Sequence, residues 1–133
     1  MRRMPAIVLA LLLVVLAGCG TGSSERDVAA TVDRFQAALT QRDGAAACAE
    51  LTPSTRASLE SQERAPCARA VLELDLRGGG SVASSDVYMN AAVAEITGHG
   101  SAFLDHTADG WRISATGCTP TPRDRPYDCE LEG

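Results

Sequence analysis

The thiol of Cys19 is the side chain whose type and position most clearly predict chemistry. Cys19 follows two small residues and a continuous apolar stretch over residues 6–17, and two arginines precede that stretch. This order is typical of a secretory signal that is cut after small residues. A membrane-spanning helix needs roughly 20 apolar residues, which this stretch does not reach. The sequence therefore predicts a cleaved signal peptide over residues 1–18.

The four residues that end at this thiol, Leu16-Ala17-Gly18-Cys19, resemble the lipobox of bacterial lipoproteins. The resemblance implies that Cys19 becomes the mature N-terminus and carries a thioether-linked diacylglycerol, with acyl chains such as palmitate. Two acyl chains would hold the protein on the extracytoplasmic face of the cell membrane. Residues 19–24 would then be the lipidated cysteine and a short polar tether. The alternative is an ordinary signal peptide that ends at an unmodified cysteine.

The four remaining cysteines form an even set, which in an exported protein indicates two disulfides. They are Cys48, Cys67, Cys118 and Cys129. Of the three possible pairings we expect Cys48–Cys67 and Cys118–Cys129, because each pair is close in sequence and shares one type of local structure. A zinc site would need a short CxxC spacing, which the sequence lacks, so we expect no metal and no other cofactor.

His106 is the candidate for acid–base chemistry. It is the one ionisable side chain that we place on the apolar face of the predicted sheet, where it could act as an acid, a base or a hydrogen-bond donor to a ligand. The alternative is a histidine at the open end of the sheet that bonds to a backbone carbonyl. The sequence has no nucleophile motif, and the glycines at 78–80 lack the lysine and helix of a phosphate loop. A non-enzymatic role is therefore favoured.

Helices are predicted for the first half of the mature chain. One apolar stripe recurs at helical period: Val28, Val32, Phe35 and Leu39. It predicts a helix over 25–42, with Ser24 as its N-cap. Capping by Asp43 and Thr52 and the proline signals Thr52-Pro53 and Ala65-Pro66 predict three shorter helices, over residues 45–51 and 53–61 and from Pro66 onward.

Strands are predicted for the second half. The period changes to two after the glycines, which predicts four antiparallel strands, over residues 82–88, 91–97, 101–107 and 111–116. Turns at Gly98-His99-Gly100 and Asp109-Gly110 set the register, and His99 should face solvent in its turn. One face is then apolar and packs on the helices, with Ala115 on it and Thr116 on the other face. The pocket candidates on this face are Ala92, Ala94, Leu104, His106, Trp111 and Ile113.

Charge and length limit the classes of function. Two of the 12 basic residues lie in the signal and none of the 17 acidic residues does, which leaves the mature part with a net charge of −7. That sign disfavours nucleic-acid binding and attraction to anionic lipids. The mature chain is the size of one small domain, which we place at residues 25–117, followed by a disulfide-tied tail over 118–133.

Helices followed by a curved antiparallel sheet resemble the NTF2-like superfamily, a cone-shaped α+β fold. The resemblance covers residues 25–116 and is carried by the first helix, the break Arg42-Asp43-Gly44-Ala45 and the closing strand Asp109-Gly110-Trp111-Arg112-Ile113. The cysteine-tied tail resembles small lipoproteins of actinobacteria. The superfamily includes isomerases, dehydratases, transport factors and accessory domains, so the fold alone implies no chemistry.

The sequence leaves three hypotheses for function. The first is a membrane-anchored, non-enzymatic domain of the cell envelope that binds a small apolar ligand in the cone or a protein partner on the outer sheet face. The second is an isomerase- or dehydratase-type enzyme that uses His106. The third is a structural accessory subunit whose cone is filled by its own side chains. The space around His106 separates the first two from the third.

Overall fold

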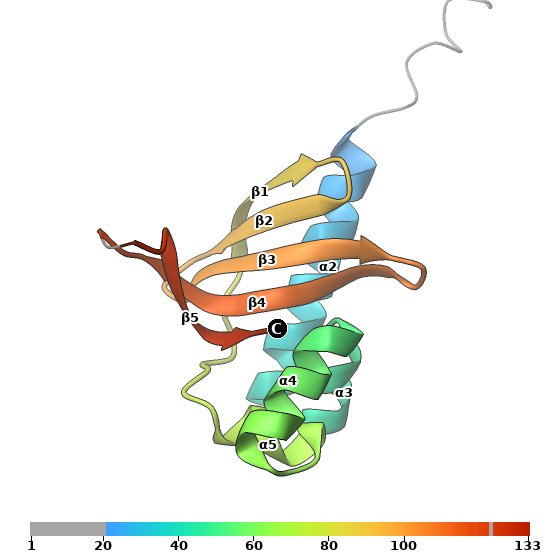
Figure 1. The fold of residues 1–133 in the computed structure, drawn as a ribbon. Helices are drawn as coiled ribbons and strands as arrows, with labels where there is room; N and C mark the ends of the chain where they lie inside the picture. Colours follow the sequence, from blue (N-terminus) through green and yellow to red (C-terminus); the bar gives the residue numbers. More distant parts are fainter. Residues whose placement is uncertain (1–20, 123) are drawn as a thin grey trace, which may run out of the picture.

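The computed structural model describes residues 21–122 and 124–133. It is an α+β fold of helices and a five-stranded antiparallel open sheet (Figure 1). The helices are α2 (Thr21–Thr40), α3 (Gly44–Ala49), α4 (Pro53–Glu63) and α5 (Cys67–Glu73). The strands are β1 (Val82–Tyr88), β2 (Ala91–Ile96), β3 (Gly100–Thr107), β4 (Gly110–Pro120) and β5 (Tyr127–Glu132). The predicted signal peptide and Cys19 lie outside the described residues.

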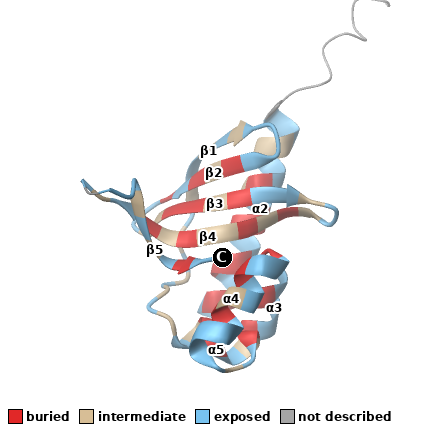
Figure 2. Cartoon of the chain, in the orientation of Figure 1, coloured by how far each residue is buried: buried red, intermediate tan, exposed pale blue. Residues whose placement is uncertain are grey.

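Helix α2 lies across one face of the sheet and contributes much of the core (Figure 2). The predicted stripe is confirmed, since three of its members are fully buried and the fourth is 8% exposed: Val28, Val32, Phe35 and Leu39. The spacing of these residues at helical period places all four on the side of the helix that faces the sheet.

The start of α2 differs from the prediction. The helix begins at Thr21, so Ser24 lies within its first turn instead of capping it. Residues 21–24 of the expected tether therefore belong to the helix. The side chain of Arg26 supports this extension, because its Nε donates a hydrogen bond to the Gly22 carbonyl one turn earlier (2.9 Å).

The short helices begin where the sequence signals capping. The Asp43 side chain accepts a hydrogen bond from the Ala46 N–H (3.0 Å) and caps α3. Thr52 caps α4 in the same way, accepting from the Thr55 N–H (3.1 Å), with a proline as the next residue. These caps satisfy N–H groups that a helix end otherwise leaves without partners.

Both predicted disulfides are confirmed. Cys48–Cys67 joins α3 to α5, with Cα atoms 6.1 Å apart. Cys118–Cys129 joins β4 to β5, with Cα atoms 4.0 Å apart. Helices as short as α3 and α5, of six and seven residues, are marginal on their own. The Cys48–Cys67 bond therefore stabilises two helices that have little stability of their own.

The sheet is a meander in which β1 to β5 pair in sequence order. The face toward α2 is apolar, as predicted, and its buried residues are Ala92, Ala94, Ile96, Ala102, Leu104, Trp111 and Ile113. We call the opposite side the outer face; its side chains include Asp86, Tyr88, Val93, Glu95, Phe103 and Asp105. The separation of apolar and polar residues between the faces follows the period-two pattern of the sequence.

The two predicted turns lie one residue earlier than expected. Ile96 pairs with Gly100 and Thr107 pairs with Gly110, so each glycine opens the following strand instead of ending the turn. Both glycines have positive φ, +73° and +95°, a conformation that favours glycine over other residues. Each shift moves both strands of its hairpin together, so the shifts themselves move no side chain to the other face.

A bulge in β4 overturns the prediction for two residues. Leu104 pairs with Ile113, but the preceding Phe103 pairs with Ala115, so β4 carries an extra residue. Ala115 therefore shares the outer face with Phe103, and Thr116 turns into the core, where it is 2% exposed. A strict period-two pattern could not predict this inversion.

The C-terminal segment is a fifth strand, where we predicted only a tail. Residues of β5 pair with β4 along its far end, and Leu131 of β5 is 3% exposed. The prolines that argued against a strand lie at the end of β4 and in the turn, where no ladder hydrogen bond is lost. The end of β4 and all of β5 thus belong to the same sheet as the rest of the domain.

Candidate functional site

The pocket that we expected beneath the sheet is filled. Its candidate residues are between 0% and 5% exposed and belong to one hydrophobic cluster with α2: Ala92, Ala94, Leu104, Trp111 and Ile113. His106 lies on the predicted face but beyond the helical cover, and its side chain is exposed. Its ring lies edge-on to Trp111, with ring centroids 5.0 Å apart. Five of the six pocket candidates are therefore core residues, and the sixth, His106, lies at the surface.

The polar groups in this interior are satisfied by the fold itself. Thr55 Oγ1 donates to the Ser114 carbonyl (2.9 Å), and Thr31 Oγ1 bonds to the Asp27 carbonyl (3.0 Å). Among the described residues, every fully enclosed side-chain nitrogen or oxygen has a hydrogen-bond partner. The enclosed polar groups of the described core therefore have their hydrogen-bond partners within the fold.

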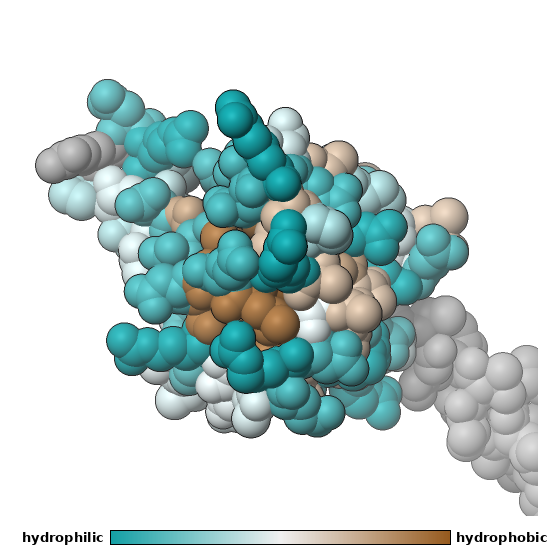
Figure 3. Space-filling view, turned by 90° about the horizontal axis from the view of Figure 1, so that it is seen from below, coloured by the Kyte–Doolittle hydropathy of each residue, from teal (hydrophilic) through white to brown (hydrophobic). Residues whose placement is uncertain are grey.

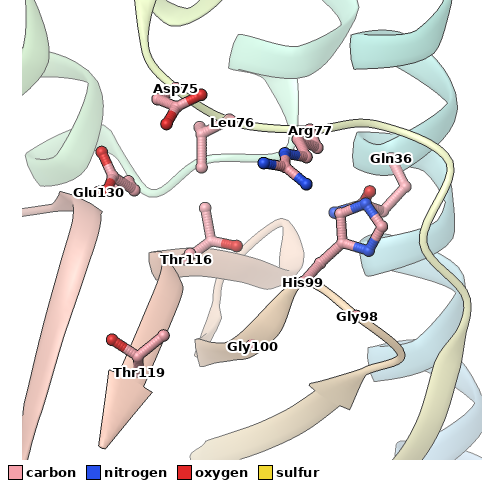
Figure 4. Close-up of a pocket in the computed structure, with 11 residues that line it drawn as sticks. Gln36, Asp75, Leu76, Arg77, Gly98, His99, Gly100, Thr116, Thr119 and Glu130 are labelled. Carbon is pink, nitrogen blue, oxygen red and sulfur yellow. The ribbon is translucent and has the colours of Figure 1, made fainter. Parts of the chain in front are cut away.

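A polar cleft of about 220 Å³ lies elsewhere, at the edge of the helix–sheet contact (Figure 4). Its walls come from α2, the α5–β1 connection, the β2–β3 turn and the paired ends of β4 and β5. The lining residues are Gln36, Asp75, Leu76, Arg77, Gly98, His99, Gly100, Thr116, Gly117, Thr119 and Glu130. Five separate segments thus meet at one small concave site.

Two nearly buried polar side chains reach this cleft with an unpartnered atom. Gln36 is 4% exposed, and its Oε1 accepts a hydrogen bond from the Gly80 N–H (3.1 Å). Its Nε2 has no hydrogen-bond partner among the described residues, nor does Oγ1 of Thr116, which is 2% exposed. Every fully enclosed polar atom there has a partner, so these two atoms must border open space. The open space that both residues line is the cleft.

Charged groups of both signs surround these two atoms. The guanidinium of Arg77 points into the cleft beside the ring of His99, whereas Asp75 and Glu130 lie toward the opposite side (Figure 4). His99 Nδ1 lies 2.8 Å from the Thr97 carbonyl. Since a carbonyl only accepts, Nδ1 carries the proton and Nε2 is left for other partners. Within the described part of the chain, Arg77 forms no ion pair with either carboxylate.

Sequence analysis missed this cleft. We expected His99 to face solvent, but it is half-buried, and we assigned no role to Gln36 or Arg77. In the sequence, the glycines of the α5–β1 connection were tested against the phosphate-loop motif. In the structure, they let the backbone of this connection approach α2 closely. A Cβ at Gly78 would come within 2.6 Å of the Thr40 nitrogen, so only glycine lets the connection lie against α2.

A hydrophobic patch occupies another surface. Figure 3 views the molecule from the end formed by α3, α4 and α5, and hydrophobic side chains gather there within a polar rim. The half-buried apolar residues of α5 and the connection after it are Leu72, Leu74 and Leu76. Patches of this kind are common on monomeric proteins and do not by themselves define a site.

Comparison with protein-family models, curated proteins and solved structures finds no match for this chain. Of the helices that the structure describes, none combines the length and the apolar character that crossing a bilayer requires. The described residues contain no group of three or more His, Cys, Asp or Glu side chains placed to hold a metal ion.

Proposed function

We propose that this chain is a lipid-anchored lipoprotein of the bacterial cell envelope, with an NTF2-like domain that binds a protein partner and carries out no catalysis. The observation that carries the proposal is the filled interior, because the enzymes and ligand carriers that we considered need an open cone. Five side chains of the expected pocket are core residues, and His106 is exposed. Recognition must then take place on the surface.

The location rests on the sequence and on the disulfides. The signal and the lipobox-like run before Cys19 support export and lipidation. Two disulfides form and persist in oxidising compartments, which fits the extracytoplasmic side of the membrane. Because the mature part is acidic, anionic lipids would not attract it, so the acyl chains would supply the membrane affinity.

The outer face of the sheet is the surface that we assign to the partner. Phe103 and Val93 are half-buried there, and the Phe103 ring lies edge-on to Tyr127 at 5.0 Å. A shallow hollow of about 290 Å³ beside them could accept a partner side chain. Exposed carboxylates flank this apolar centre, at Asp86, Glu95 and Asp105. The face therefore suits a protein with an apolar contact and a basic rim.

The anchor can be tested by metabolic labelling with a palmitate analogue. The full chain should incorporate the label and sediment with membranes, whereas Cys19→Ala should lose the label and be released. The paired change Cys118→Ser and Cys129→Ser is the control, since it removes cysteine sulfur elsewhere in the chain without freeing a thiol and should keep the label. An unlabelled parent chain would contradict lipidation.

The partner surface can be tested with a photo-crosslinking residue in the envelope of intact cells. At Val93 it should yield one defined adduct, whereas at the exposed Ala57 of α4 it should yield none. The adduct should weaken when Asp105 and Glu95 are replaced by Asn and Gln, because a basic partner loses its complementary charge. Equal crosslinking at both positions would contradict the assignment of the outer face.

A further inference from the structure

We infer that the polar cleft is a binding site for a small zwitterion of the amino-acid class. The carboxylate of the ligand would lie at the end formed by Arg77, His99 and Gln36, and its ammonium at the end formed by Asp75 and Glu130. This site lies apart from the outer face and needs no lipid anchor. The inference therefore stands or fails separately from the proposed function.

The best-placed neutral donor in the cleft is Gln36. This side chain is 4% exposed, and its oxygen is held by the Gly80 N–H, which directs its Nε2 to the cleft. Buried amide donors almost always have a hydrogen-bond partner, which can be protein, water or ligand. The Thr116 hydroxyl likewise belongs to a side chain that is nearly buried, lines the cleft and has no hydrogen-bond partner in the described chain. The cleft thus holds two pre-positioned polar groups that the described chain leaves without partners.

A carboxylate is the chemical group that best fits this end of the cleft. The guanidinium of Arg77 matches a carboxylate with two parallel hydrogen bonds, and it is not engaged by an ion pair within the described residues. Gln36 Nε2 adds a neutral donor. His99 is held in place by its bond to the Thr97 carbonyl, which fixes the ring at the border of the site.

An ammonium group fits the opposite end. Asp75 and Glu130 lie there, on the α5–β1 connection and on β5, and Thr116 lies between the two ends (Figure 4). A carboxylate accepts hydrogen bonds from an ammonium and gains charge attraction as well. The separation of acidic and basic groups across one cleft selects a ligand that carries both charges.

Size and net charge agree with this class of ligand. The cleft measures about 220 Å³, below the roughly 300–1,000 Å³ typical of drug-sized ligands. A free amino acid is small enough for such a site, and its net charge of zero avoids repulsion from an acidic protein. A simple anion would gain the contacts of Arg77 but would lie near two unneutralised carboxylates.

The test is a titration of the full chain in detergent micelles with each of the twenty common L-amino acids, followed by backbone amide NMR. At least one should shift the signals of Gly98, His99 and Gly117, with Kd on the order of 1 mM or below. The N-acetyl derivative and the amide of that amino acid, each lacking one charge, should bind at least about tenfold more weakly.

Two substitutions locate the site. Arg77→Gln and Glu130→Gln should each weaken binding at least about tenfold, because each removes one charge-assisted contact. Arg69→Gln is the matched control, since Arg69 is an exposed arginine on α5 that does not line the cleft. If none of the twenty shifts these signals, the inference is wrong. Equal binding of the N-acetyl derivative, or no effect of Arg77→Gln, would also overturn it.

Discussion

Two regions of this molecule occupy comparable positions between helix and sheet but have opposite properties. Under the middle of the sheet, the side chains of α2 and of β2, β3 and β4 fill the space, and the polar groups there bond to one another. At the edge, the α5–β1 connection and the β2–β3 turn leave a cleft with free donors and carboxylates. Space for a ligand between a helix and a sheet thus depends on whether the core side chains fill it, and not on the order of the elements alone.

The largest difference between the regions should appear in stability. Phe35→Ala removes a fully buried ring from the filled region and should destabilise the fold by about 3–5 kcal/mol. Arg77→Gln in the cleft should change the free energy of unfolding by no more than about 0.5 kcal/mol. Urea denaturation of both variants measures this difference. Similar losses for the two would mean that the cleft is part of the structural core.

Removing either disulfide should lower the stability of the fold by a similar amount, but the two changes should differ in their effect on binding at the cleft. Replacing both cysteines of either pair by serine should cost about 3 kcal/mol, because the closed loops, of 19 and 11 residues, differ little in entropy. Only loss of Cys118–Cys129 should also weaken amino-acid binding, since that bond holds the strands that carry Thr116 and Glu130. Thermal unfolding would measure the loss of stability in each variant, and titration with the amino acid would measure the loss of binding. Equal loss of binding without Cys48–Cys67 would argue against a local role.

Two buried threonines offer a matched pair of isosteric changes. Thr55→Val removes a hydroxyl that donates to the Ser114 carbonyl, and should cost about 1–3 kcal/mol. Thr116→Val removes a hydroxyl without a partner in the described chain, and should be within about 0.5 kcal/mol of neutral. Denaturation measures both. A large cost at Thr116 would show that its hydroxyl has a structural role.

A small effect is also expected at the ion pair between Arg34 of α2 and Glu50, the residue that follows α3. Arg34 donates through Nε and Nη2 to the two Glu50 oxygens, at 2.8 and 3.0 Å. The hydrogen bond to Glu50 raises the pKa of Arg34, while partial burial opposes this. Because the pKa of Arg34 is raised by folding, charged Arg34 stabilises the fold at every pH below the ordinary pKa of arginine. This stabilisation is lost only when the pH rises above that range. Arg34→Gln should therefore cost at most about 1 kcal/mol, equally across neutral pH and less in high salt.

The sequence predicted what depends on local pattern. The stripe of α2, the caps at Asp43 and Thr52, the first four strands and both disulfide pairings follow from periodicity, capping chemistry and cysteine spacing. Pattern could not predict the bulge after Ile113, because an inserted residue reverses the faces without changing composition. The fifth strand was not predicted because prolines precede it, at the end of β4 and in the turn.

The cleft could not be predicted for a different reason. Its residues come from five segments that are distant in sequence, and no single segment has a recognisable motif. Gln36 lies on an otherwise ordinary helix, and Arg77 lies next to glycines whose role is close packing. His106 attracted attention because its face was predicted correctly, but the end of the helical layer, which leaves it exposed, depends on tertiary packing.

The space between α2 and the middle of the sheet is filled by side chains, whereas the cleft at the edge is open. Binding of xenon tests the filled interior most directly. Xenon enters empty apolar cavities and shifts the NMR signals of the methyl groups that line them. Methyl spectra of the full chain under xenon should show no shifts at Ala92, Ala94 or Ile113. Xenon-dependent shifts at these methyls would reveal an internal apolar cavity, contradict the filled interior and restore the hypothesis of an apolar ligand in the cone.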